Sequence, residues 1–187
     1  MNISGGELGR GFRAFPGGVV NISGGTVGLE SQANTGSVVN ISGGTVGSDF
    51  NALSGSVLNI SGGTISGGLD AFSGSVLNIS GGALGDDFDA LSGSTVNILG
   101  SVFLLDGLEL DFLELGQAFT ILDRDVTLSG LLANGESFSF DLNSSFSDPQ
   151  DFFAPDATLT LTLAVPEPSS SAFIFLAVAV GFARRRR

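Results

Sequence analysis

Carboxylates are the side chains of this sequence whose type and spacing could do chemistry. In the first half of the chain, aspartates recur at loosely periodic positions: Asp49, Asp70, Asp86, Asp87 and Asp89. Carboxylates can bind divalent cations, and a pair of them in a cleft can act as the acid and base of a carbohydrate-cleaving enzyme. The last three form the only dense cluster in this region, so they are the first candidates for such a site.

The other groups that such chemistry needs are missing. The sequence has no cysteine, histidine, tryptophan or tyrosine, and all seven basic residues are arginines. This composition excludes disulfides, cysteine-ligated metals and catalysis by imidazole, thiolate or lysine amine. The G-G-x-G-x-D motif of calcium-binding β-rolls is absent, and Arg10 and Arg13 lie about four repeats from the aspartate cluster. We therefore expect an acidic rim solvated by water, with no cofactor and no bound metal; weak cation binding is the alternative.

The charge distribution argues against a nucleic-acid partner. Residues 1–165 contain three arginines and eighteen acids, a net charge of −15, and the other four arginines end the chain. Such a surface repels phosphate groups. A high net charge also helps to keep a protein soluble.

The aspartates are positioned by a strict repeat of nineteen residues, with the consensus V-N-I-S-G-G-T-V-G-x-D-F-D-A-F-S-G-S-V. A glycine pair in each repeat would break a helix, because each glycine costs about 1 kcal/mol relative to alanine. The alternation in V-N-I predicts short strands instead. Stacked in register about 4.8 Å apart, such repeats form a parallel β-solenoid. We predict an all-β fold with about five 19-residue coils over residues 1–100, of either hand.

Five columns of residues are predicted to fill the interior, because equivalent positions lie above one another in a solenoid. The first contains Val20, Val39, Leu58, Leu77 and Val96; the second Ile3, Ile22, Ile41, Ile60, Ile79 and Ile98; the third Leu8, Val27, Val46, Ile65, Leu84 and Phe103. The fourth contains Phe12, Phe50, Leu69 and Phe88, and the fifth Phe15, Leu53, Phe72 and Leu91. Ser31 and Asn34 replace apolar residues in the last two columns, so the second coil is predicted to be weak.

One polar column lies between the first two apolar columns, so a period of two points it outward. Its members are Asn2, Asn21, Asn40, Asn59, Asn78 and Asn97. Stacked side-chain amides can hydrogen-bond along the stack, and we predict such a ladder here. The same N-I-S letters match the N-glycosylation motif, which is the alternative interpretation.

Residues 101–164 lose the repeat and are predicted to form a β-rich cap on the C-terminal end of the solenoid. Asn134-Gly135 stands between two apolar runs and predicts a hairpin with a type I′ turn. Leu159, Leu161 and Leu163 alternate with threonine, as in a half-buried strand. A cap is expected because an open end exposes unpaired backbone groups.

Residues 165–187 form a tail with three parts: a Pro-Glu-Pro and serine linker, a short apolar run and four arginines. Fifteen residues from Ser169 would span about 22 Å as a helix, less than the roughly 30 Å of a bilayer core, so snorkelling or thinning is needed for a transmembrane segment. The arginines should stay on the cytoplasmic side, with the body of the protein across the membrane. A short core helix is the alternative.

This tail resembles the PEP-CTERM sorting signal of bacterial envelope proteins that are processed by an exosortase. The resemblance implies a sorting motif at Val165, Pro166, Glu167 and Pro168, and retention by Arg184, Arg185, Arg186 and Arg187. It implies a transient membrane anchor at Ala172, Phe173, Ile174, Phe175, Leu176, Ala177, Val178, Ala179, Val180, Gly181, Phe182 and Ala183. The glycine-rich repeats also resemble arrays that precede such tails. Members of this family carry a secretory signal, so we expect a signal peptide and further coils upstream of Met1.

Together these features predict an exported, non-enzymatic surface or extracellular-matrix protein. Its expected partners are an exosortase-type enzyme, the cytoplasmic membrane and an extracellular polysaccharide. It is expected in the cell envelope, anchored by the C-terminal helix before processing and at the surface or outside afterwards. A β-helix polysaccharide lyase or hydrolase and a glycan-binding adhesin are the alternatives, because a fold alone does not decide function.

Overall fold

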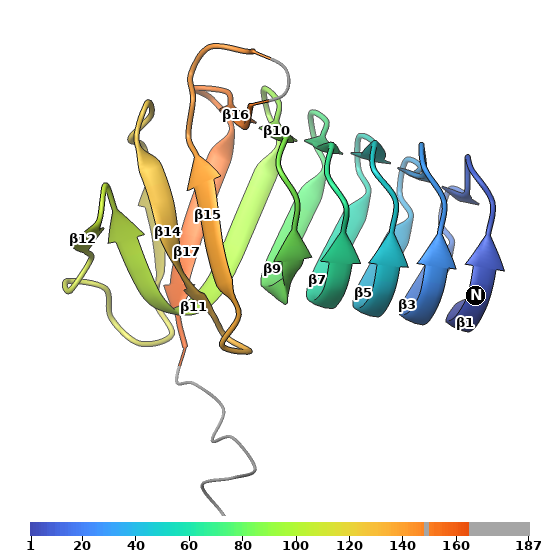
Figure 1. Cartoon of the computed structure of the whole chain (residues 1–187). Helices are drawn as coiled ribbons and strands as arrows, with labels where there is room; N and C mark the ends of the chain where they lie inside the picture. The colour runs from blue at the N-terminus through green and yellow to red at the C-terminus, as the bar shows by residue number, and fades with distance from the viewer. Residues whose placement is uncertain (148–149, 165–187) are drawn as a thin grey trace, which may run out of the picture.

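The computed structural model describes residues 1–147 and 150–164, and it is a parallel β-solenoid of about five turns (Figure 1). Each coil contributes one long and one short strand. The long strands are β1 (Asn2–Leu8), β3 (Val19–Val27), β5 (Val38–Val46), β7 (Val57–Ile65), β9 (Val76–Leu84) and β11 (Thr95–Leu105). The short strands are β2 (Arg13–Ala14), β4 (Gln32–Ala33), β6 (Phe50–Ala52), β8 (Leu69–Ala71) and β10 (Phe88–Ala90).

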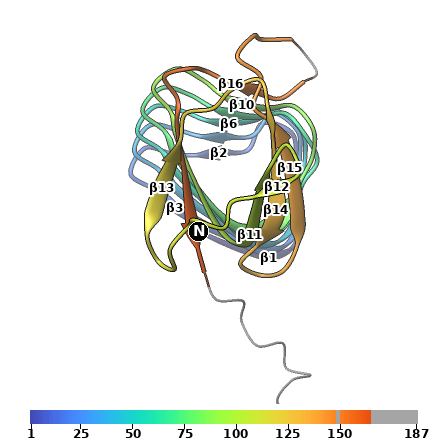
Figure 2. The same cartoon turned by 90° about the vertical axis from the view of Figure 1, so that its left-hand side faces the viewer.

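The coils are held in register by parallel backbone pairing at the predicted period. The long strands pair in the order β1-β3-β5-β7-β9-β11, and the short strands pair β2-β4-β6-β8-β10. In each step an asparagine lies beside the asparagine of the next coil, as Asn40 lies beside Asn59. Viewed from the end, the coils enclose one continuous interior (Figure 2). The predicted solenoid is therefore confirmed.

The Ser-Gly-Gly sequence forms a bulge that bends the long strands β1, β3, β5, β7 and β9 from one face of the solenoid to the next. The pairing register shifts there in each of the four steps from β1 to β9, for example between Ile41 and Ser42. A Cβ on Gly43 would lie 2.7 Å from the carbonyl oxygen of Ser23 in the neighbouring coil, and Gly44 has a φ of 83°. Both positions therefore require glycine, one for close backbone approach and one for its left-handed conformation.

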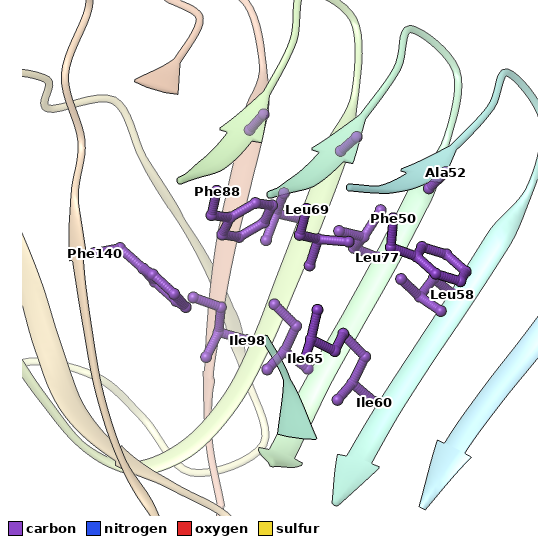
Figure 3. Packing of buried hydrophobic residues seen from close by; sticks show 14 of the residues in the cluster. Phe50, Ala52, Leu58, Ile60, Ile65, Leu69, Leu77, Phe88, Ile98 and Phe140 are labelled. Atoms are coloured by element: carbon purple, nitrogen blue, oxygen red, sulfur yellow. The ribbon is translucent and has the colours of Figure 1, made fainter. Parts of the chain in front are cut away.

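The interior is filled by aliphatic and aromatic side chains (Figure 3). In the third coil Val39, Ile41 and Val46, from the first three predicted columns, are all fully buried. Phe50 and Phe88 of the fourth column are also fully buried. Burying such a side chain stabilises the fold by about 1.5–3 kcal/mol.

The fifth predicted column is wrong. Phe15 is 74% exposed, and Phe72 is only half-buried on the outer side of its corner. The inward position is instead the preceding alanine: Ala14, Ala33, Ala52, Ala71 and Ala90, none more than 1% exposed. The strands alternate with a period of two, so the second residue after an inward phenylalanine or leucine also points inward.

The second coil is also less defective than predicted. Asn34 lies on the outward column that Phe15 and Leu53 share, so it leaves no gap in the core. Ser31 does replace a large residue of the fourth column and is fully buried. Its hydroxyl donates to the carbonyl of Gly28 at 2.8 Å, which satisfies the buried donor.

After β11 the chain makes an excursion and then returns to the stack. The strands of this part are β12 (Leu108–Glu109), β13 (Ala118–Ile121), β14 (Thr127–Leu132), β15 (Ser137–Asp141), β16 (Phe152–Phe153) and β17 (Thr158–Leu163). β14 and β15 form an antiparallel hairpin beside β11, whereas β16 pairs parallel with β10 and β17 parallel with β11. The turn between β16 and β17 closes with Ala157 N–H donating to Ala154 at 3.0 Å, as Ser94 N–H donates to Leu91 at 3.0 Å. The last strands thus add a partial coil.

The hairpin turn differs from the prediction. Gly135 has a φ of 88°, but Asn134 lies outside the left-handed region that a type I′ turn requires. Leu132 N–H donates to Glu136 at 2.8 Å and Gly135 N–H to Leu132 at 2.9 Å, so the loop has three residues and ends in a glycine bulge. Two consecutive positive φ angles occur instead at Asp106 and Gly107, between β11 and β12.

Replacing the buried alanine should harm the fold more than replacing its aromatic neighbour. We expect Ala71→Leu to lower the free energy of unfolding by about 1–3 kcal/mol, because the added atoms overpack a filled interior. Phe72→Leu, in the next position, should cost less than about 1 kcal/mol. Denaturant unfolding followed by circular dichroism measures both. A larger loss of unfolding free energy for Phe72→Leu would mean that the side chains of the fifth column do contribute to the core.

Candidate functional site

The outer face of the long strands carries a continuous ladder of asparagine amides. Each amide nitrogen donates to the amide oxygen of the preceding coil, at 2.7 Å from Asn21 to Asn2 and at 2.8 Å from Asn97 to Asn78. The three intervening bonds are all 2.7 Å long. The amide nitrogen that glycosylation would modify is therefore a ladder donor. An amide can make about four hydrogen bonds and the ladder uses two, so one donor and one acceptor per coil can serve a ligand.

A column of serines runs beside the ladder. Ser42, Ser61 and Ser80 each direct their hydroxyl to an isoleucine carbonyl of the preceding coil, at 3.4 Å. These long bonds are weak, because O–H···O bonds are usually about 2.7–2.8 Å long. The hydroxyls can therefore exchange this partner for a ligand at little cost.

Two adjoining hollows form a groove at the C-terminal end of this face. The first has a volume of about 310 Å³ and is lined by Asn59, Ile60, Ser61, Asn78, Ile79, Ser80, Asn97, Ile98, Leu99 and Thr162. The second, of about 320 Å³, shares Ser61, Ser80 and Leu99 with it and adds Ala133 and Asn134. No charged side chain belongs to either lining. We call this feature the ladder groove.

The wall of the ladder groove comes from segments that lie far from the repeats in sequence. Thr162 belongs to β17, and Asn134 lies at the tip of the β14–β15 hairpin. The Glu136 carboxylate fixes this tip, because it accepts from the backbone N–H of Gly82 and from the Asn134 amide. Sequence analysis predicted the asparagine column but not this wall, because nothing in the repeat indicates where the hairpin folds back.

A larger hollow of about 580 Å³ lies at the first coil, where Met1, Phe12 and Phe15 contribute to its lining. This hollow opens at the N-terminal end of the solenoid, where no described strand pairs with the outer edge of the first coil. Arg13 is the one polar side chain in its lining, so it offers fewer polar side chains to a ligand than the ladder groove does. The ladder groove is the better candidate.

Backbone conformation explains two of the five periodic aspartates. Asp49 and Asp87 have φ angles of 63° and 70°, and the equivalent residues of other coils are Gly11, Glu30 and Gly68, which also have positive φ. Aspartate tolerates the left-handed region better than most residues. These carboxylates therefore mark a corner of the coil, and among the described residues no group of three or more acids is placed to hold a metal ion.

Asp70 is a carboxylate of this group whose pKa is raised. It lies in the middle of β8, beside Asn51 of β6 and Asp89 of β10. Burial, and then the negative charges of Asp87 and Asp49, raise the pKa of Asp70 from 3.8 to about 6. The ionised form is therefore destabilising in the folded state.

Two other charged groups hold the last coil in place. Asp151 accepts from the backbone N–H of Phe88 at 2.9 Å and of Asp141 at 3.0 Å, although burial, the larger influence, raises the pKa of its carboxyl. The Arg124 guanidinium donates to carbonyls of Phe153, Ala154 and Ala157 at 2.8–3.3 Å, and burial lowers its pKa. Their roles are structural, and the repeat gave no signal for either.

The predicted sorting motif, anchor and retention arginines, residues 165–187, lie outside the described residues. Within residues 1–147 and 150–164, no helix is long and apolar enough to cross a bilayer.

A family model described as the PEP-CTERM protein-sorting motif matches residues 164–187, which confirms the predicted resemblance of the tail. Comparisons with curated proteins and with solved structures found no match. The sorting motif indicates an exported or cell-envelope protein that an exosortase-type enzyme processes.

Neutralising Asp70 should stabilise the protein in a pH-dependent way. The folded-state pKa lies above the unfolded one, so stability falls as pH rises from about 4 to 6, and the full penalty is present above 6. We expect Asp70→Asn to raise the free energy of unfolding by on the order of 1 kcal/mol at pH 7.5, after allowance for solvent screening, and to change it little at pH 4. Urea unfolding at both pH values measures this.

Glu7→Gln serves as the control, because Glu7 is exposed on β1. Its effect should be the same at both pH values. An equal response of the two variants to pH would show that the folded environment of Asp70 does not raise its pKa.

Proposed function

We propose that this chain is a non-enzymatic surface or extracellular-matrix protein whose ladder groove binds a neutral polysaccharide. The observation that carries the proposal is the contrast between an acidic body and a groove that has no charged side chain in its lining but includes three asparagine amides and two serine hydroxyls. Two coils of the groove each offer an asparagine amide and a weakly bonded serine hydroxyl. A polymer with hydroxyl groups at regular intervals along its length can hydrogen-bond to these repeated groups. An anionic polymer would be repelled by the surrounding carboxylates.

The sorting motif supports a location at the cell surface. In this proposal the apolar segment of the tail anchors the chain in the cytoplasmic membrane, an exosortase-type enzyme removes it, and the body is released to the surface or the surrounding matrix. A rigid solenoid suits this role, because its polar ladder presents the same groups at a constant spacing.

Residues 101–164 serve in this proposal as the cap of the solenoid and as one wall of its binding groove. The β14–β15 hairpin and the returning strands β16 and β17 lie beside the last full coil (Figures 1 and 2). Covering that coil prevents another chain from adding a strand to it. The same strands contribute Thr162 and Asn134 to the groove.

A carbohydrate-active enzyme is the rival function. Asp70, with its pKa near 6, has the ionisation that a general acid needs. However, neither hollow of the ladder groove has an aspartate or glutamate in its lining. Binding without turnover therefore accounts better for the geometry. An adhesin would differ from a matrix protein only in having one defined glycan partner.

Polysaccharide binding can be tested by co-sedimentation of the purified protein with an insoluble neutral β-glucan and with an anionic gel such as alginate. We expect retention on the neutral polymer only. Ser61→Asp should reduce it about tenfold, because the new charge has to be desolvated in the groove.

Ser23→Asp is the matched control, since Ser23 occupies the same position two coils away from the groove. It should leave retention unchanged. Equal losses in the two variants, or no retention at all, would contradict the ladder groove as the site, and release of reducing sugars from either polymer would favour the enzyme.

Export and processing can be tested on the native product. We expect its intact mass, from the envelope fraction and the culture medium, to lack the residues after about Pro168. A product found only in the cytoplasm with residues 165–187 intact would contradict the sorting proposal.

A further inference from the structure

Three apolar side chains form an exposed patch next to the end of the last strand. Phe112, Leu115 and Phe119 are 56%, 59% and 41% exposed. The rings of Phe112 and Phe119 contact each other edge to face, with centroids 5.0 Å apart. We call these three residues the terminal patch. An acidic, soluble body gains nothing from leaving such a cluster in water.

The terminal patch adjoins the point where the chain leaves the fold. Gly116 N–H donates to the carbonyl of Leu163 at 2.9 Å, and Leu115 bridges to Leu163, the last residue of β17. Both views show the segment between β12 and β13 passing the end of β17 (Figures 1 and 2). Whatever follows residue 164 therefore begins at the edge of the patch.

Acidic residues flank the terminal patch in sequence. Glu109, Asp111 and Glu114 are exposed in the same segment, and residues 101–123 contain no basic residue. The segment that carries the patch thus combines exposed apolar side chains with negative charge. The tail has the complementary composition, because the apolar run 172–183 is followed by four arginines.

We infer that residues 165–187 dock onto the terminal patch of the unprocessed chain before the membrane takes up the tail. The apolar run covers Phe112, Leu115 and Phe119, and the terminal arginines pair with the three acids. Seven residues, 165–171, with a reach of roughly 25 Å, connect the fold to the apolar run, so the tail can fold back. Docking shields the run from water during transit. This inference goes beyond the polysaccharide role and does not depend on it.

The chain's own tail fits the patch better than a lipid surface or a second copy. Anionic headgroups would be repelled by Glu109, Asp111 and Glu114. A second copy would bring the same acids to a matching patch. The tail is also tethered beside the patch, which gives it a high effective concentration.

The charge half of the interaction can be tested with carboxypeptidase B, which releases C-terminal arginine, on the full chain in detergent-free buffer. Docked arginines should be protected. We expect the triple variant Glu109→Gln/Asp111→Asn/Glu114→Gln to release arginine about fivefold faster than the unaltered chain. The difference should shrink at high salt.

The matched control is Glu7→Gln/Asp49→Asn/Asp86→Asn, which removes three exposed acids elsewhere. It should release arginine at the unaltered rate. Equal acceleration by both triple variants would mean that overall charge governs the rate, and would overturn the docking.

The apolar half can be tested by hydrogen exchange of the backbone amides in residues 110–120 of the full chain. Phe175→Asp/Val178→Asp changes only the tail and leaves the fold intact, so we expect about fivefold faster exchange in that segment. Unchanged exchange would overturn the inference. Protection of these amides that rises with protein concentration would also overturn it, because a second copy would then cover the patch. Protection seen only with added vesicles would overturn it as well, because lipid would then cover the patch.

Discussion

The parallel backbone pairing between coils is the constraint on which the rest of this structure depends. It places each residue beside the residue nineteen positions later, so a property of one position becomes a property of a whole column. Amides in one column form a ladder, and isoleucines in another form a continuous strip of core. Where one coil's carbonyl approaches the next, as at Ser23 and Gly43, the same pairing requires glycine.

The end of the solenoid is organised by a return of the chain. The excursion after β11 brings β16 and β17 back into parallel register with β10 and β11, although residues 152–163 share little sequence with the repeats. Arg124 and Asp151 stabilise this return by bonding to backbone groups of the turn and of its neighbours. Hydrogen bonds to several backbone groups at once offset the cost of half-burying a charge.

The proposed function follows from a groove whose lining has no charged side chain. The body carries a net negative charge, with Asp49 and Asp87 at the corners of the coils and Glu109, Asp111 and Glu114 in the segment of the terminal patch. The ladder groove is neutral, and it combines amides from the repeats with Thr162 and Asn134 from the last strands. The repeats alone are a surface; the returning strands turn part of that surface into a groove.

The sequence by itself determined the nineteen-residue period, the all-β solenoid, the columns of valine and isoleucine, and the sorting motif of the tail, because each is a local or periodic pattern. It did not determine which side of the corner faces inward. In β6 the side chains alternate, so Phe50 and Ala52 both point into the core and the larger Leu53 does not. Tertiary structure alone decided the return of β17, the groove wall at Asn134 and the raised pKa of Asp70, because each depends on contacts between residues far apart in the chain.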